Sequence, residues 1–234
     1  MYEIRMQHPA KNSLGNDLMG WLEFELERAG KEPLLITGTA DSFSAGLNLK
    51  EVASMDERSM EVFLRRLDAL AARLYQHPAP TVACVSGHAI AGGCVLMMCC
   101  DWRVARRDPK IKIGVNEVSI GACFPPAIFG IVRARLAPHV RERVMLGAGL
   151  SNVDEALALG LIDEIADDAE DAAKMRIEIL SSYPRAAYAL TKSVLRQGIS
   201  DVTPAALERF RKKEVPLWAS AEMKERVAVV LGKR

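Results

Sequence analysis

The chain has 234 residues, half of them hydrophobic, and its 31 Lys and Arg nearly balance its 30 Asp and Glu. A net charge of +1 gives no basis for nucleic-acid binding by bulk electrostatics, and the five cysteines show no metal-ligand spacing. The longest apolar stretch, residues 89–100, falls short of the about 20 residues that a membrane span needs. We therefore expect no nucleic-acid, metal or membrane site, and a reducing, cytoplasmic location.

Short apolar runs and periodic helices alternate in the first half of the chain. Strands are predicted at residues 2–6, 34–37, 81–85 and 102–105, with the first at a sheet edge. Helices are predicted over residues 14–29, 57–76 and 91–99; the first would be capped by Asn12 or Ser13 and ended by Gly30. Later helices are predicted over residues 126–136, 139–147, 152–159, 169–182, 186–196 and 204–231, with a strand at 161–165. This order predicts an α/β fold with a C-terminal helical extension.

Two glycine-containing corners follow predicted buried strands. In Phe43–Asn48, small residues around Gly46 leave backbone N–H groups unshielded, although an ordinary strand-to-helix turn explains the same pattern. In Gly87–Cys94, adjacent glycines open a buried helix whose first N–H groups have no partner within the helix. Such glycines let a ligand approach the backbone closely, but close helix packing also requires them.

A carboxylate lies between apolar residues in a third segment, Ile113–Glu117. Burial raises the pKa of a carboxyl group and suits it to general acid or base catalysis. The alternative is a Glu side chain that caps a nearby backbone turn.

The three segments, in this order, resemble the crotonase superfamily, also called the enoyl-CoA hydratase/isomerase family. His8–Leu14 is similar to the family's early Arg-Pro-x-x-Asn-Ala-Leu turn, and residues 156–165 to its Ala-Leu-Ala-Leu-Gly-Leu-Ile-Asp segment. The similarity covers nearly the whole chain and is most specific over residues 34–126. It implies an α/β fold: a ββα spiral core over residues 1–182, and a helical region over 183–234 that packs in homotrimers, often paired into hexamers.

The resemblance also implies an acyl-CoA thioester substrate, with coenzyme A present only as part of that substrate and no separate cofactor. The thioester carbonyl would lie between the backbone N–H groups of Leu47 and Gly92, which stabilise a developing enolate oxygen. Lys50 would lie near the CoA phosphates, with a solvated surface lysine as the alternative. The other substrate-binding residues expected are Ala45, Gly46 and Gly93. Phe124 and Pro125 are expected to wall the acyl pocket, with core packing as the equal alternative.

Two positions separate the reactions of the family. Its hydratases hold water between two glutamates, and this chain has Val95 at the first position and Glu117 at the second. A single Glu is the pattern of the Δ3,Δ2-enoyl-CoA isomerases, whose Gly-Leu-Asn-Glu is similar to Gly114–Glu117. The resemblance thus predicts an isomerase that converts 3-enoyl-CoA to 2-enoyl-CoA, with Glu117 as its only base.

Other functions stay open. One is another reaction of the family, such as enoyl-CoA hydration or thioester hydrolysis, and another is a non-catalytic acyl-CoA-binding paralogue. Asn48 stands where the family usually has Asp. The basic run from Arg103 to Lys112 could bind CoA phosphates or RNA, but a solvated face is the default expectation. We expect a structural role for His88 and capping of a turn by Asp101. Cys94 and Cys123 could line the pocket, but without a paired base we do not expect them to act as nucleophiles.

Overall fold

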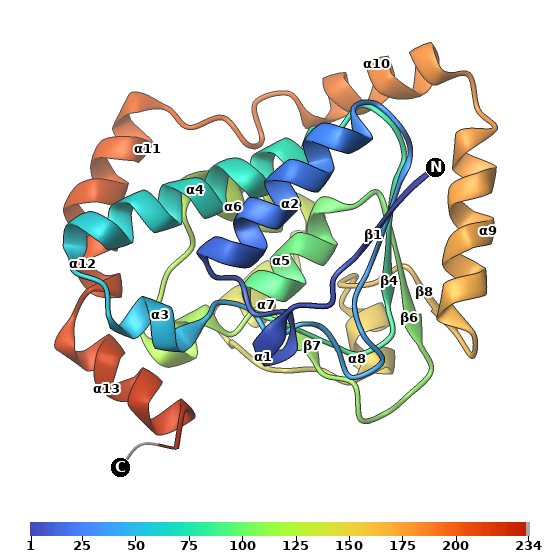
Figure 1. Ribbon diagram of the computed structural model, residues 1–234. Coiled ribbons are helices and arrows are strands. Elements are labelled where there is room, and N and C mark those ends of the chain that lie inside the picture. Colours follow the sequence, from blue (N-terminus) through green and yellow to red (C-terminus); the bar gives the residue numbers. More distant parts are fainter. Residues whose placement is uncertain (233–234) are drawn as a thin grey trace.

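A five-stranded parallel sheet lies at the centre of the fold (Figure 1). The structure, a computed structural model, describes residues 1–232, so the end of the predicted region 183–234 lies outside the described residues. The strand order is β1-β2-β4-β6-β8. The strands are β1 (Tyr2–Arg5), β2 (Leu34–Thr37), β4 (Thr81–Val85), β6 (Trp102–Arg106) and β8 (Glu164–Ala166). The predicted edge strand and the three buried strands are confirmed, whereas β8 begins at Glu164 rather than at Leu161.

Helices cover both faces of this sheet, which explains why its strands read as continuous apolar runs. One face packs against α9 (Ala169–Ser181) and contributes Leu35, Val82, Cys84 and Val104 to a small core. The opposite face joins the main core with α2 (Asn16–Ala29), α4 (Glu57–Tyr75) and α5 (Gly92–Cys99). Figure 1 shows α9 across the strands from these three helices.

A second, three-stranded parallel sheet was not predicted. It has the order β3-β5-β7, with β3 (Ser42–Ser44), β5 (His88–Ile90) and β7 (Ile113–Gly114). Strands of two or three residues are too short to show an alternating pattern, so the sequence gives no periodicity to find. The interpretation of Phe43–Asn48 as one corner is therefore corrected: β3 comes first, and the corner leads on to α3 (Leu49–Ala53).

The start of α2 also differs from the prediction. The helix begins at Asn16 after Gly15, which provides no side-chain cap, so neither Asn12 nor Ser13 caps it. Gly30 ends the helix with φ +57°, as predicted.

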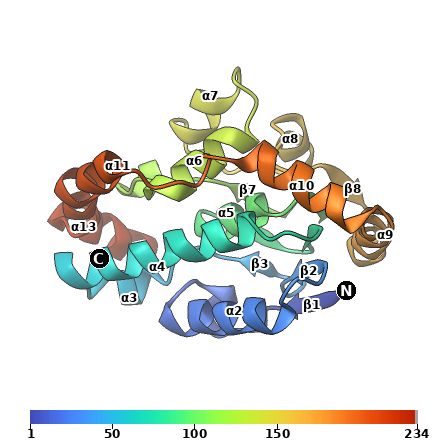
Figure 2. The ribbon, with the colours of Figure 1, turned by 90° about the horizontal axis from the view of Figure 1, so that it is seen from above.

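Most predicted helices of the second half are present. They are α6 (Pro126–Arg135), α7 (Arg141–Met145), α8 (Val153–Ala158) and α10 (Arg185–Arg196). Of these, α6, α7 and α8 are shorter than predicted, and α10 begins one residue earlier. Figure 2 shows α10 next to α9, with α11 and α13 at the other end of the molecule, reached through the non-helical segment 197–203. In the described part of the chain, no helix combines the length and apolarity needed to cross a membrane.

The long helix predicted over residues 204–231 is interrupted once, at Ala219–Ser220. Before the interruption, α11 (Pro204–Arg209), a π-helical turn at Phe210–Glu214 and α12 (Val215–Trp218) follow one another without a gap, and α13 (Ala221–Val230) comes after it. Ser220 caps α13 by accepting a hydrogen bond from the Met223 N–H at 3.2 Å. Phe210, Trp218 and Val227 of this region all belong to the main core.

Candidate active site

The three-stranded sheet carries the three unusual segments to one place. Its strands are parallel, with Ser44 opposite Ala89, and Ile90 opposite Gly114. The chain leaves each strand at the same edge of the sheet, where the carboxyl ends of parallel strands meet. Leu47, Gly92 and Glu117 each follow their strand by two or three residues and line a common cavity.

The Asn12 side chain holds the backbone at the start of the first corner, Phe43–Asn48. Asn12 ends a left-handed turn, α1 (Pro9–Asn12), in which Ala10, Lys11 and Asn12 have φ of 52°, 59° and 55°. Its buried side-chain amide donates at 3.1–3.2 Å to the carbonyl oxygens of Met6, Ser42 and Phe43, and its side-chain oxygen accepts from the His8 N–H at 2.7 Å. This explains the Asn in the early turn: one side chain ties the N-terminal segment to β3, just before Gly46.

The Leu47 N–H makes no hydrogen bond within residues 1–232. The chain on either side is held by Leu14, whose N–H donates to the Gly46 carbonyl at 2.7 Å and whose carbonyl accepts from the Asn48 N–H at 2.9 Å. In this parallel bridge the N–H of the central residue, Leu47, faces away from Leu14. It therefore remains available to a ligand in the cavity.

Gly46 lets the first corner touch the second. Its φ is +84°, and a Cβ placed on it would lie 2.7 Å from the Ile90 carbonyl oxygen and 3.3 Å from the Gly92 nitrogen. A side chain here would be strained and would separate the two corners. The glycine thus keeps the N–H groups of Leu47 and Gly92 near each other.

The second corner opens α5. Ala91 adopts φ +49° and ψ −123°, an unusual conformation for a residue with a side chain, and α5 begins at the next residue. The Gly92 N–H has no hydrogen-bond partner among the described residues, and the positive end of the helix dipole reinforces it as a donor. Gly93 has no room for a side chain, because a Cβ would collide with the Ser44 carbonyl.

The cavity between the corners has a volume of about 290 Å³ and an almost wholly apolar wall. Its lining comes from Ala45, Leu47, Leu49, Leu67, Ile90, Ala91, Gly92, Val95, Asn116, Glu117, Ile120, Cys123, Phe124, Pro125, Ile128, Leu150, Trp218 and Val230. Glu117 is the one carboxylate in this set. The other titratable group, the Cys123 thiol, has a pKa raised to about 11, mainly by burial and then by Glu214, so it is neutral at pH 7.

Glu117 is a buried carboxyl group without a counter-charge. It begins the 3₁₀ turn η1 (Glu117–Ile120), its exposed fraction is 6%, and its Oε2 is shielded from solvent with no hydrogen-bond partner in the described chain. Burial raises its pKa to about 7, and its own backbone N–H opposes this only in part. A carboxyl group with a pKa near neutral pH can both accept and return a proton.

The structure brings most of the predicted site residues together. Ala45, Phe124 and Pro125 line the cavity with Leu47, Gly92 and Glu117, whereas Gly46 and Gly93 lie behind its wall. Lys50 lies on α3, exposed and outside the lining, although its neighbour Leu49 is part of it.

Sequence reasoning missed the contribution of the C-terminal helices. Trp218 of α12 and Val230 of α13 both line the cavity, and the Trp218 indole N–H donates to the Cys123 carbonyl oxygen at 2.9 Å. The sequence signal for burial there is the pair of aromatic residues Phe210 and Trp218 in a segment rich in charge.

Arg103 corrects the expectation of a solvated basic run. Its guanidinium is 6% exposed and forms a two-point ion pair with Asp163, with both N–O distances 2.7 Å. Arg106 and Arg107 pair with carboxylates at the surface, as expected of a solvated face. His88 has the expected structural role, since its Nδ1 accepts from the Lys112 N–H at 3.0 Å.

An apolar cavity with two available backbone N–H groups and one buried carboxyl group is an arrangement suited to polarising a carbonyl beside an acidic C–H bond. The chain belongs to the enoyl-CoA hydratase/isomerase family, whose model matches residues 1–233. Crotonase-superfamily membership and the α/β fold expected from it are thereby confirmed.

Proteins similar to this chain carry both activities in their names. It is 27% identical over 205 residues to enoyl-CoA delta isomerase 1, mitochondrial, of Mus musculus. The matched residues cover 85% of this chain and 71% of the mouse protein. It is also 27% identical over 238 residues to crotonyl-CoA hydratase of Syntrophomonas wolfei, covering 96% and 88%. The crystal structure of human mitochondrial delta3-delta2-enoyl-CoA isomerase matches with a TM-score of 0.88 at 24% identity, over 99% of this chain and 92% of that one, which is a likeness of fold.

Proposed function

We propose that this chain is an enoyl-CoA isomerase that converts a 3-enoyl-CoA to the 2-enoyl-CoA. The observation that carries the proposal is the single carboxylate of the cavity. Glu117 lines it, and the apolar Val95 occupies the place where a family hydratase has its first glutamate. Two carboxylates hold the attacking water in a hydratase, so an apolar wall with one carboxylate favours proton transfer over water addition.

The proposed reaction needs one base that works twice. Glu117, ionised, removes a proton from C2, and the electron pair moves into the thioester carbonyl to give a dienolate. The N–H groups of Leu47 and Gly92 donate to the dienolate oxygen. Glu117 then returns the proton to C4, so the double bond moves from C3–C4 to C2–C3 and no atom is gained or lost. The reaction uses no cofactor beyond the coenzyme A of the substrate.

The electrostatics of Glu117 support this cycle. A carboxylate with an ordinary pKa would be too weak a base for a C–H proton, and burial without a counter-charge strengthens it. Exclusion of water by Val95, Phe124 and Trp218 also protects the conjugated product from hydration.

The test offers 3-enoyl-CoA and 2-enoyl-CoA in parallel and follows the absorbance of the conjugated thioester. We expect absorbance to rise with the 3-enoyl substrate, and Glu117→Gln to lower the rate by about 10²–10⁴-fold. A fall in absorbance with the 2-enoyl substrate would instead identify a hydratase, and release of a free thiol would identify a thioester hydrolase. Silence on both substrates, with acyl-CoA still bound, would favour the non-catalytic paralogue.

Val95→Glu is the matched gain-of-function variant. It places a second carboxylate in the wall of the same cavity, so we expect it to add hydration of 2-enoyl-CoA while slowing isomerisation. If hydration does not appear, the single-carboxylate argument loses its main support.

The coenzyme A moiety and the oligomer form the rest of the proposal. Lys50 lies one residue beyond Leu49 of the cavity wall, so we propose that it attracts the CoA phosphates at the cavity mouth. Lys50→Ala should then raise KM at low ionic strength and leave kcat unchanged. We also propose a homotrimer or a hexamer, which light scattering on the purified protein would distinguish.

A further inference from the structure

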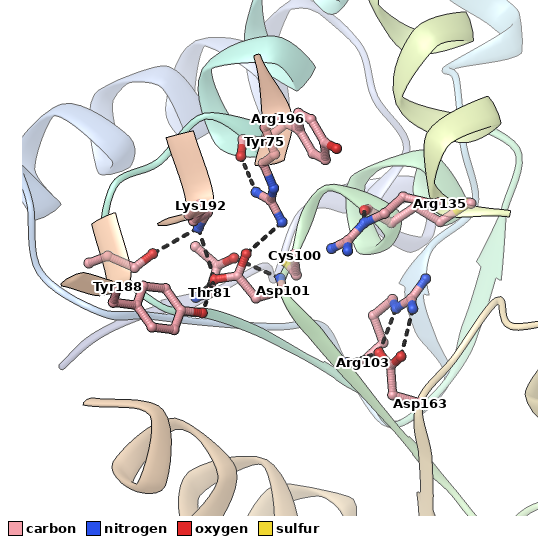
Figure 3. A network of polar contacts seen from close by, with 12 residues as sticks. Tyr75, Thr81, Cys100, Asp101, Arg103, Arg135, Asp163, Tyr188, Lys192 and Arg196 are labelled. Atoms are coloured by element: carbon pink, nitrogen blue, oxygen red, sulfur yellow. Dashed lines mark hydrogen bonds and ion pairs between the residues drawn. The ribbon is translucent and has the colours of Figure 1, made fainter. Parts of the chain in front are cut away.

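A buried ionic cluster lies between α10 and the start of β6, away from the substrate cavity (Figure 3). Its centre is Asp101, whose role goes well beyond capping a turn. One carboxylate oxygen accepts from Lys192 Nζ and the Tyr188 hydroxyl at 2.8 Å each and from the Thr81 N–H at 2.9 Å; the other accepts from Arg196 at 2.6 Å. The cluster thus attaches α10 to the five-stranded sheet.

The cluster holds more positive than negative charge. Lys192 and Arg196 share the single carboxylate of Asp101, and their side chains are only 7% and 4% exposed. Arg135 of α6 adds a third cation, and its guanidinium points toward Asp101 in Figure 3. The nearby Arg103 is already neutralised by Asp163 and does not share a carboxylate with these residues.

Arg135 is the cation without a counter-charge. Its Nε donates to the Met98 carbonyl oxygen at 2.7 Å, but neither terminal nitrogen donates a hydrogen bond within residues 1–232, and Nη2 is shielded from solvent. Burial and then the neighbouring arginines lower its pKa, which is the effect expected of a crowded positive site. The Arg135 side chain as a whole is half-buried, and its guanidinium carbon lies 5.8 Å from the Tyr75 ring centroid, so the ring compensates part of its charge. An anion at the open Nη1 would supply the counter-charge that the described chain does not provide.

A cavity of about 450 Å³ lies against this excess charge. Arg135, Lys192 and Arg196 line it together with Asp101, and Tyr183 and Thr191 bring hydroxyl groups. It shares no lining residue with the substrate cavity. Lys192 Nζ donates two of its three protons, to Asp101 and to the Ala79 carbonyl, which leaves one donor in the lining that it shares with Arg135.

We propose that this cavity is an oxyanion site, in which Arg135 binds a carboxylate or phosphate group through Nη1, its solvent-accessible terminal nitrogen, and Lys192 supplies a further donor. Hydrogen bonds from a guanidinium or an ammonium group to an ionised oxygen are roughly twice as strong as neutral ones. The oxyanion has two possible sources: a free small anion, or an acidic side chain of a second copy of this chain.

The test compares Arg135→Met with Arg133→Met, a control on the same helix whose exposed guanidinium lies 5.9 Å from the Phe129 ring centroid, outside this cavity. Thermal melts are recorded with increasing inorganic phosphate or acetate against chloride at matched ionic strength, and particle mass is measured by light scattering. We expect phosphate to raise the melting temperature of the wild type and of Arg133→Met to a plateau, and to have no such effect on Arg135→Met.

The two sources give different results. A free anion stabilises the wild type without changing its mass. If an acidic side chain of a second copy fills the site, added phosphate has no effect or dissociates the oligomer. Of the two variants, only Arg135→Met then lowers the particle mass. If Arg135→Met does not fold, Arg135→Lys keeps the charge, is too short to place a donor at the position of Nη1 and should weaken phosphate binding at least tenfold. Equal melting responses and equal masses for the position-135 and position-133 variants would overturn the proposal.

Discussion

Replacing Glu117 with Gln should make the protein more stable at alkaline pH. The folded chain holds this carboxyl group at a pKa of about 7, against 4.5 for the ordinary group. Between these values the folded state keeps a proton that the unfolded state has lost, so the free energy of unfolding falls as pH rises from about 4.5 to 7. The raised pKa corresponds to a loss of about 3 kcal/mol, complete above pH 7. Gln has nearly the same shape and does not titrate, so it removes this loss.

The measurement is urea unfolding of both proteins between pH 4.5 and 8.5 at one protein concentration. We expect the stability of Glu117→Gln minus that of the wild type to grow with pH and to level off above pH 7. Glu225→Gln, which removes an exposed carboxylate of α13, controls for the change in net charge. Parallel stability curves for wild type and Glu117→Gln would refute the reasoning, because they would mean that this carboxyl group is solvated in solution.

Three further results are expected. The rate with saturating 3-enoyl-CoA should rise with pH and level off above about 7, as the base Glu117 ionises, and a pH-independent rate would contradict its role. Gly46→Ala should lower the rate at least tenfold and destabilise the fold by roughly 1–3 kcal/mol, measured by urea unfolding, because its φ is +84° and its Cβ would meet the Ile90 carbonyl. Asp101→Asn leaves Lys192 and Arg196 without a counter-charge and should cost about 3–5 kcal/mol in the same assay; a loss below 1 kcal/mol would show that the pairs are solvated.

The parts of the fold with strong periodicity could be predicted from the sequence. Helix α4 repeats apolar residues on one face over 19 residues, and its predicted and observed bounds differ by one residue at the C-terminal end. The strands β3, β5 and β7 have no such pattern, since their three, three and two residues are positioned by pairing with distant segments. The interruption of the last helix between α12 and α13 also depends on tertiary packing, since Phe210 and Trp218 of this region are buried in the main core.

The candidate site divides in a similar way. Glycines at positions 46, 92 and 93 stood out because they follow predicted buried strands, although only the resemblance to a family favoured a ligand site over an ordinary turn or close helix packing. Trp218 and the ionic cluster around Asp101 were not, because their partners lie about 90 or more residues away and surface charge patterns give no sign of such pairs.

The two halves of the proposed chemistry are encoded differently. Polarisation of the carbonyl depends on the N–H groups of Leu47 and Gly92, which every residue except proline carries, so ordinary point mutations at these positions leave the donors in place. Proton transfer depends on the side chain of Glu117 and on the side chain at position 95 of α5, which lines the same cavity. Drift at positions 95 and 117 could therefore redirect the reaction between isomerisation and water addition while thioester activation is inherited unchanged with the path of the backbone.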